Sequence, residues 1–143
     1  MLQRIQSVWL LLAGAAAAVT FRFPFYSGSW RDITWTAAVP PMPKELNAQS
    51  SLLLTILTAL ICGLAFVTIF LYGNRKMQLR FAVVGLVLSL VLLALYFLEF
   101  AQFVEGTMAL SSVFYFAIPI CFFLAIRGVV RDNKLIRSMD RLR

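Results

Sequence analysis

Two long apolar segments, residues 51–72 and 81–103, constrain the fold of this chain more than any other feature. About 20 apolar residues in a helix, at about 1.5 Å of rise each, span the hydrocarbon of a bilayer. Between the two segments lies a short polar stretch, Gly73 to Arg80, which contains three cations and no anion. This pattern predicts two membrane-spanning helices that are joined by a turn on the cytoplasmic side.

Two further apolar segments, residues 7–23 and 111–127, bring the predicted number of spans to four. Hydrophobic residues make up 62% of the chain and charged residues 13%, as is typical of proteins that fold in lipid. Four spans use more than half of the 143 residues, which leaves little for a separate soluble module. We therefore predict an all-α membrane protein with four transmembrane helices and a single domain, residues 1–143.

The first and fourth apolar segments each carry a feature of their own. Residues 15–18 are alanines, and with one early cation the opening also fits a cleaved signal peptide. We predict an uncleaved span instead, because the apolar character continues through Phe21 and Phe23. In the fourth segment Pro119 predicts a kink, since proline removes a backbone donor from the helix.

The distribution of cations predicts the topology. Ten of the 13 cations lie on one side of the predicted spans, at residues 4, 75, 76, 80, 127, 131, 134, 137, 141 and 143, and the other three at residues 22, 31 and 44. Because cytoplasmic segments carry an excess of Lys and Arg, we predict that both termini are cytoplasmic. Topology and anionic head groups account for the net charge of +7, so we predict no nucleic-acid partner.

Outside the spans we predict an outer loop, residues 24–50, and a cytoplasmic tail, residues 128–143. In the loop, residues 30–36 could form a short extended piece, whereas its aromatic residues favour an interfacial belt, comprising Phe25, Tyr26, Trp30 and Trp35. The tail is predicted to be an amphipathic helix on the anionic inner leaflet or, alternatively, a docking helix for a partner. Its candidate docking cations are Arg127, Arg131, Lys134, Arg137 and Arg141.

The residues point to no catalytic set and to no cofactor or metal site. The chain has no histidine, and both cysteines, Cys62 and Cys121, fall within predicted spans, where a structural disulfide is not expected. No phosphate-binding glycine loop or metalloprotease motif occurs, and no nucleophile lies beside a base. We therefore predict that the protein is not an enzyme.

The best candidate for a functional site is a polar group in the outer half of the predicted bundle. It comprises Arg22, Tyr96, Glu99 and Gln102, of which the last three are predicted to share one helix face. We hypothesise that Arg22 and Glu99 approach each other, because a charge near hydrocarbon needs a partner or water. The pair would then either lock helix packing or border a small polar cavity. Alternatively, the two side chains reach the interface separately.

Three stretches of this sequence resemble a known family. Residues 1–8, 74–78 and 126–143 are similar to those of a four-span family of inner-membrane proteins from Bacteroidetes bacteria, whose label is a domain of unknown function. The resemblance covers essentially the whole chain and is most specific at the two termini. It implies a bacterial inner-membrane protein whose first span is retained, and it provides no catalytic residue to carry over.

Two hypotheses for function follow. The first is a non-enzymatic accessory or scaffold subunit that packs against other membrane subunits or against copies of itself. It is based on pairs of small residues four positions apart, which allow close helix contact: Gly14 and Ala18, Ala59 and Gly63, and Gly85 and Ser89. The alternative is a small transporter or channel component that uses the outer polar group around Arg22 and Glu99.

Overall fold

A computed structural model describes residues 3–30 and 43–140. Within these residues the chain forms four long helices, one short 3₁₀ helix and three strands. The helices are α1 (Gln3–Val19), α2 (Leu52–Phe70), η1 (Leu71–Gly73), α3 (Arg75–Phe100) and α4 (Ser112–Asp140), and the strands are β1 (Tyr26–Trp30), β2 (Pro43–Leu46) and β3 (Phe103–Met108).

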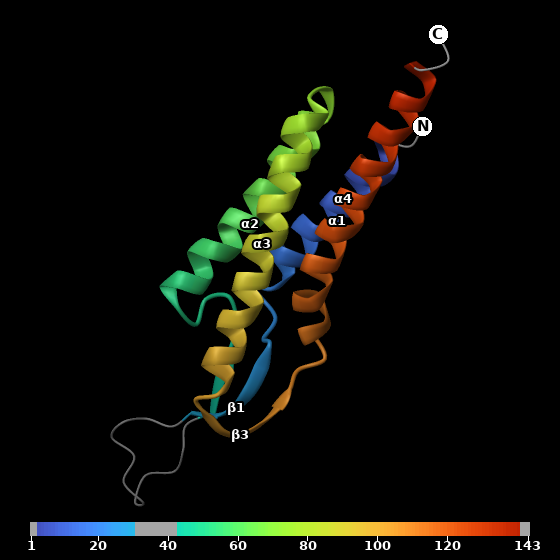
Figure 1. The fold of residues 1–143 in the computed structure, drawn as a ribbon. Helices are drawn as coiled ribbons and strands as arrows, with labels where there is room; N and C mark the ends of the chain where they lie inside the picture. Colours follow the sequence, from blue (N-terminus) through green and yellow to red (C-terminus); the bar gives the residue numbers. More distant parts are fainter. Residues whose placement is uncertain (1–2, 31–42, 141–143) are drawn as a thin grey trace, which may run out of the picture.

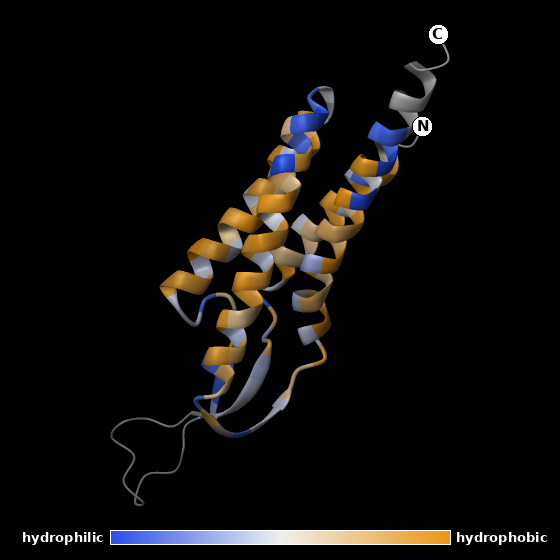
Figure 2. Cartoon of the chain, in the orientation of Figure 1, coloured by the Kyte–Doolittle hydropathy of each residue, from blue (hydrophilic) through white to orange (hydrophobic). Residues whose placement is uncertain are grey.

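The four long helices form an up-and-down bundle with the strands at one end (Figure 1). α1 packs against α2 and α4, and α3 packs against the same two helices, so α1 and α3 are diagonal in the bundle. Both termini and the η1 turn lie at the end opposite to the sheet. This arrangement groups the basic segments at one end, where Figure 2 shows the hydrophilic stretches of the helices.

Three of the helices are long and apolar enough to cross a membrane: Leu52–Phe70, Arg75–Phe100 and Ser112–Lys134. Only 28 to 39% of the residues in their most apolar windows are buried inside the bundle, so most of their apolar surface faces outward. A surface of this kind is stable in lipid and is rare on soluble monomers. The second, third and fourth predicted apolar segments are therefore confirmed as helices of membrane-spanning length.

The first helix differs from its prediction. The predicted span covers residues 7–23, but α1 ends at Val19 and its apolar part, Ile5–Val19, is shorter than the other three. Pro24 provides the physical reason, because proline disfavours helical conformation in the residue before it. The Thr20 side chain also bonds back to the Ala17 carbonyl oxygen at 2.7 Å, as capping residues commonly do.

The prediction of an all-α protein is wrong at the end of the bundle opposite to the termini, where β1, β2 and β3 form an antiparallel sheet in the order β2-β1-β3. Gly28 and Gly106 face each other across β1 and β3. A Cβ atom on Gly106 would lie 2.5 Å from the Ser27 carbonyl oxygen, so the two strands need glycine there. Trp30 ends β1, whereas residues 31–36 of the predicted extended piece lie outside the described residues.

The basic segment after α2 is not the turn that the sequence predicts. η1 and Asn74 make the turn, and α3 begins at Arg75, six residues before the predicted span. The Asn74 side chain accepts a hydrogen bond from the Met77 backbone N–H, as an N-cap residue does. Because the residues that follow are good helix formers, Lys76 and Arg80 belong to the first turns of α3.

Residues 128–140 of the predicted tail are helical but do not form a separate helix. α4 runs without interruption from Ser112 to Asp140, through Pro119 and past the predicted end of the span at residue 127. Gly128 is the only weak helix former between Ile126 and Asp132, and one glycine in a helix costs only about 1 kcal/mol. The segment therefore continues the axis of the span, where the sequence predicted a helix lying on the leaflet.

Candidate functional site

The predicted polar group separates into one buried residue and three at the surface. Tyr96 is completely buried in α3, whereas Glu99 in the last turn of α3 is half-buried. Gln102 is exposed and lies beyond Phe100, the last residue of α3, so it does not share a helix face with the other two. Arg22 is exposed in the turn that follows α1. The shared helix face predicted for this group is therefore wrong.

Arg22 follows α1 and Glu99 lies in α3, and these two helices are diagonal in the bundle. Within the part of the chain that the structure describes, no ion pair joins their side chains. The structure therefore does not bring these two charges together. Tyr96 is the member of the group that lies inside the bundle, and its surroundings define the candidate site.

Hydroxyl groups from three helices meet at this site. Tyr96 of α3 has two polar neighbours, Thr58 of α2 and Tyr115 of α4. The hydroxyls of Tyr96 and Thr58 are buried without a hydrogen-bond partner. A buried hydroxyl without a partner costs free energy and in native proteins calls for an explanation.

The Tyr115 hydroxyl, in contrast, is partnered and secures the chain after α1. It lies 2.8 Å from the Phe23 carbonyl oxygen and 3.2 Å from the Thr20 carbonyl oxygen. These carbonyls follow the last turn of α1, where no further helical N–H group is available to them. The Tyr115 hydroxyl thus supplies a donor that the irregular segment needs at this depth.

Phe25 fills the centre of the site. Its ring centroid lies 5.3 Å from that of Tyr96 and 5.1 Å from that of Tyr115, and the two tyrosine rings meet edge to face at 4.7 Å. Phe25 is completely buried and Tyr26 nearly so, which shows that their assignment to an interfacial belt was wrong. No sequence pattern indicated this role, because an apolar residue after a proline fits an exposed loop equally well.

Backbone hydrogen bonds connect Phe25 to the chain on both sides of it. Its N–H donates to the Leu46 carbonyl oxygen at 2.6 Å, and its carbonyl accepts from the Ala109 N–H at 3.2 Å. The Ser111 hydroxyl donates to the Pro24 carbonyl oxygen at 2.6 Å. The sheet and the segment before α4 therefore hold the backbone beside the aromatic centre in place.

Apolar side chains dominate the middle of the bundle. The ring of Phe122 in α4 is completely buried and packs against Gly85 of α3. Leu64 of α2 and Ile61 pack beside them in the apolar core. The interior is thus filled by side chains between the hydroxyl groups and the opposite end.

At the end with the termini, α1 and α4 share a second buried polar contact. The Gln6 amide donates a hydrogen bond to the Asp132 carboxylate, and both side chains are buried. Gly128 makes room for Gln6, because a Cβ atom there would lie 2.8 Å from the Gln6 Cγ atom. Sequence patterns alone did not indicate this pair, since the two residues are 126 positions apart.

Four of the five predicted docking cations of the tail belong to α4. Arg127, Arg131 and Lys134 are exposed, Arg137 belongs to the last turns of α4, and Arg141 lies outside the described residues.

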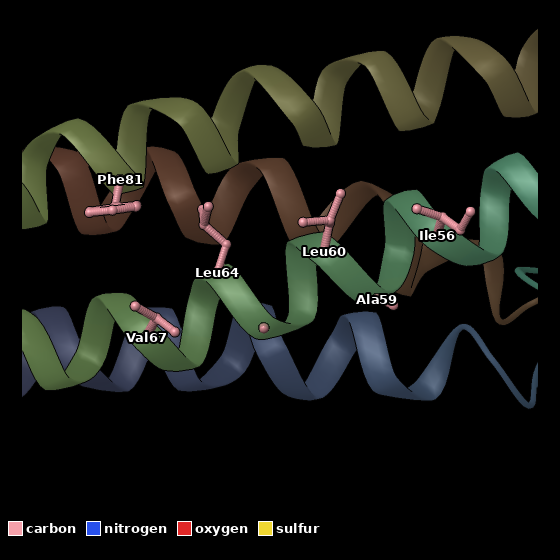
Figure 3. Close-up of a pocket in the computed structure, with 7 residues that line it drawn as sticks. Ile56, Ala59, Leu60, Leu64, Val67 and Phe81 are labelled. Carbon is pink, nitrogen blue, oxygen red and sulfur yellow. The ribbon is translucent and has the colours of Figure 1, made fainter.

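The pairs of small residues have different surroundings. Gly85 and Ser89 are buried between helices, and Gly14 packs against Phe66 and Ala65 of α2 while Ala18 is exposed. Ala59 and Gly63 face outward, into an apolar groove of about 560 Å³ along α2 (Figure 3). The groove is lined by Ile56, Ala59, Leu60, Gly63, Leu64, Val67 and Phe81. A Cβ atom on Gly63 would meet nothing within 4 Å.

The two cysteines, Cys62 and Cys121, are free thiols in α2 and α4. Across residues 3–30 and 43–140, no three His, Cys, Asp or Glu side chains gather in a group that could hold a metal ion. The candidate site therefore consists of hydroxyl groups, aromatic rings and backbone carbonyls.

Comparison with known proteins places this architecture in a family. Residues 2–142 match the family described as a domain of unknown function, DUF4293. The chain belongs to this family. No curated protein matches the sequence. The family label agrees with the resemblance seen in the sequence, and the role of the candidate site is inferred from its geometry.

Proposed function

We propose that this DUF4293 protein is a four-span protein of the bacterial inner membrane with both termini in the cytoplasm. α1 completes the bundle by packing along α2 and α4, so we infer that it crosses the membrane with them. The grouping of both termini and the η1 turn at the basic end supports this orientation. The sheet then lies on the outer side of the membrane.

Thiol labelling tests this topology. Cys62 and Cys121 are first replaced by alanine, and single cysteines are then placed at Gln102, near the sheet, and at Lys76, near η1. A membrane-impermeant maleimide added to intact spheroplasts should label Gln102→Cys and spare Lys76→Cys until the membrane is opened. Labelling of Lys76→Cys in intact spheroplasts would contradict the orientation.

We propose further that the protein is a non-enzymatic accessory or scaffold subunit, which packs against another membrane protein or a second copy of itself. The outward groove on α2 is the observation that carries this proposal. Its wall includes Gly63, whose backbone is open to the outside, and Ala59, one turn away. Small residues on an outward face allow another helix to approach closely, which is how helices associate where lipid removes the hydrophobic driving force.

The test compares two bulky substitutions on outward surfaces. Gly63→Leu places a bulky side chain in the groove, where a Cβ atom meets nothing within 4 Å, whereas Ala94→Leu adds bulk to an exposed position of α3 that does not line the groove. In mild detergent we expect the unmodified chain to purify with a stoichiometric partner or as a dimer. Gly63→Leu should weaken this association by at least about tenfold, or about 1.4 kcal/mol, and Ala94→Leu should leave it unchanged. A monomer that stays alone at all concentrations would contradict the proposal.

The buried hydroxyls favour a second candidate, a small transporter or channel component. Thr58 and Tyr96 present two unpartnered oxygens in the outer half of the bundle, close to the depth of Arg22 and Glu99. Phe122 fills the middle of the bundle. A path for a substrate or an ion through the bundle would therefore need the helices to separate at this residue. Liposomes loaded with a pH-sensitive dye measure ion flux directly. If the protein is a transporter or channel component, Glu99→Gln and Tyr96→Phe should change this ion flux. If it is a scaffold subunit, liposomes that contain the protein should show no more ion flux than protein-free liposomes.

A further inference from the structure

The inner turns of α4 have two opposite faces. One face contains Val129 and Asp132, which are buried against α1. The other face carries Arg127, Arg131 and Lys134, which are all exposed. Spacings of four and three residues place these three cations on one side of a helix, because each residue advances by about 100°. We call these three residues the α4 cation stripe.

The α4 cation stripe continues an apolar face of the same helix. Ile120, Phe123 and Val130 are half exposed or more and lie on the same side of α4 by helical spacing. Going from the middle of the bundle toward the terminal end, this face therefore changes from apolar to cationic. A surface of this kind matches the change from acyl chains to head groups in a leaflet.

No described side chain of opposite charge neutralises the stripe. Asp132 is the one acidic residue between Ser112 and Lys134, and its carboxylate is directed to Gln6 on the face covered by α1. The first turns of α3, at the same end of the bundle, add Arg75, Lys76 and Arg80 and no acid. The positive charge of the stripe is thus available to an external anion.

We propose that the α4 cation stripe binds the phosphate groups of anionic phospholipids in the inner leaflet, with the adjoining apolar residues in contact with the acyl chains. The guanidinium groups of Arg127 and Arg131 suit phosphate oxygens, since arginine can donate two parallel hydrogen bonds to them. The continuity of the apolar and cationic surfaces favours a lipid over an acidic soluble protein, which would need only the charges. This inference rests on the membrane orientation proposed above.

Quenching by brominated lipids measures this preference at the site itself. The three native tryptophans are replaced by phenylalanine, and Val130→Trp supplies a single fluorophore beside the stripe. The protein is placed in nanodiscs of phosphatidylcholine that contain brominated phosphatidylglycerol or brominated phosphatidylcholine. Each basic residue near an anionic surface adds about fivefold to binding, the equivalent of roughly 1 kcal/mol. We therefore expect phosphatidylglycerol to be preferred by at least about fivefold.

Two triple variants separate a local site from the effect of net charge. The first variant combines Arg127→Gln, Arg131→Gln and Lys134→Gln. It should lower the ratio of phosphatidylglycerol to phosphatidylcholine binding to about one. All three positions are exposed, so the core is unaffected. The matched control removes the same charge from α3, with Arg75→Gln, Lys76→Gln and Arg80→Gln, and should retain the preference. If both triple variants lose it equally, or if the starting protein has none, the proposal is overturned. Absence of quenching by either lipid would instead contradict the membrane assignment.

Discussion

The packing of Phe122 against Gly85 leads to a prediction with a built-in control. A Cβ atom added to Gly85 would lie 2.7 Å from the Phe122 Cζ atom and 2.8 Å from the Leu64 Cδ2 atom. The Phe122 Cε1 atom would be closer still, and ordinary carbon contacts begin near 3.4 Å, so the phenylalanine ring must retreat by about 1 Å. Because Phe122 is completely buried, no free space accepts this movement.

The cost follows from the general behaviour of overpacked cores. An extra methyl group in a well-packed interior destabilises by about 1–3 kcal/mol. Gly→Ala in a helix also gains up to about 1 kcal/mol of helix propensity, which would hide part of this cost. Gly63→Ala experiences the same gain without a clash, since nothing lies within 4 Å of its Cβ position. The difference in the free energy of unfolding between the two variants should therefore measure the cost of overpacking. We expect Gly63→Ala to be more stable than Gly85→Ala by about 1–3 kcal/mol.

The assay is reversible unfolding by SDS in mixed micelles, and far-UV circular dichroism monitors the loss of helix. The protein is diluted until any assembly has dissociated. Gly85→Ala should unfold at a lower SDS fraction than Gly63→Ala, and Gly63→Ala should match or exceed the unmodified chain. Equal midpoints for the two variants would refute the reasoning, because they would show that the interior around Phe122 yields without cost.

The same unfolding assay tests three further features. Tyr115→Phe removes the donor to the Phe23 carbonyl oxygen and should cost about 1–3 kcal/mol, whereas Tyr96→Phe removes an unpartnered hydroxyl and should be neutral or stabilising. A larger loss for Tyr96→Phe would contradict the assignment. Gln6→Ala leaves the buried Asp132 carboxylate without its donor and should cost about 1–3 kcal/mol, so an unchanged midpoint would show that this end is open to water. Gly106→Ala places a methyl group against the β1 backbone and should cost more than about 1 kcal/mol, with faster proteolysis of β3 as the second readout.

The helices of this fold were largely predictable from sequence. Segments 51–72 and 81–103 are apolar over membrane-spanning length, and α2 and α3 cover most of both. Lipid makes this signal strong, because every backbone group in a span must be satisfied within its own helix. The helix ends were less predictable, since they depend on local features such as Pro24 after α1 and the Asn74 cap before α3.

The sheet could not be predicted in the same way. β1 and β3 pair Ser27 with Thr107, far apart in the chain, and β1 contains small residues in place of alternating apolar ones. Short strands of this composition gain their stability from the partner strand and from packing under the bundle. The aromatic centre around Phe25 depends on the same long-range pairing and was therefore missed with it.

The candidate site shows a second limit of sequence reasoning. The position of a residue along a predicted span gives its depth in the membrane, and Tyr96 and Glu99 were placed at the outer depth on this basis. Depth does not reveal the direction of a side chain around the helix axis or the order of helices in the bundle. Arg22 and Glu99 are at similar depth but follow diagonal helices, so matched depth did not bring them together.

The two proposed surfaces are independent because α2 and α4 occupy opposite corners of the bundle. Each packs against α1 and α3, so their outward faces point in different directions. A partner seated in the groove beside Gly63 would leave the α4 cation stripe in contact with lipid. Gly63→Leu should therefore leave the phosphatidylglycerol preference at Val130→Trp unchanged, and loss of the stripe should leave association unchanged. Coupling between the two readouts would mean that the partner covers α4 as well, and that the stripe serves the same interface as the groove.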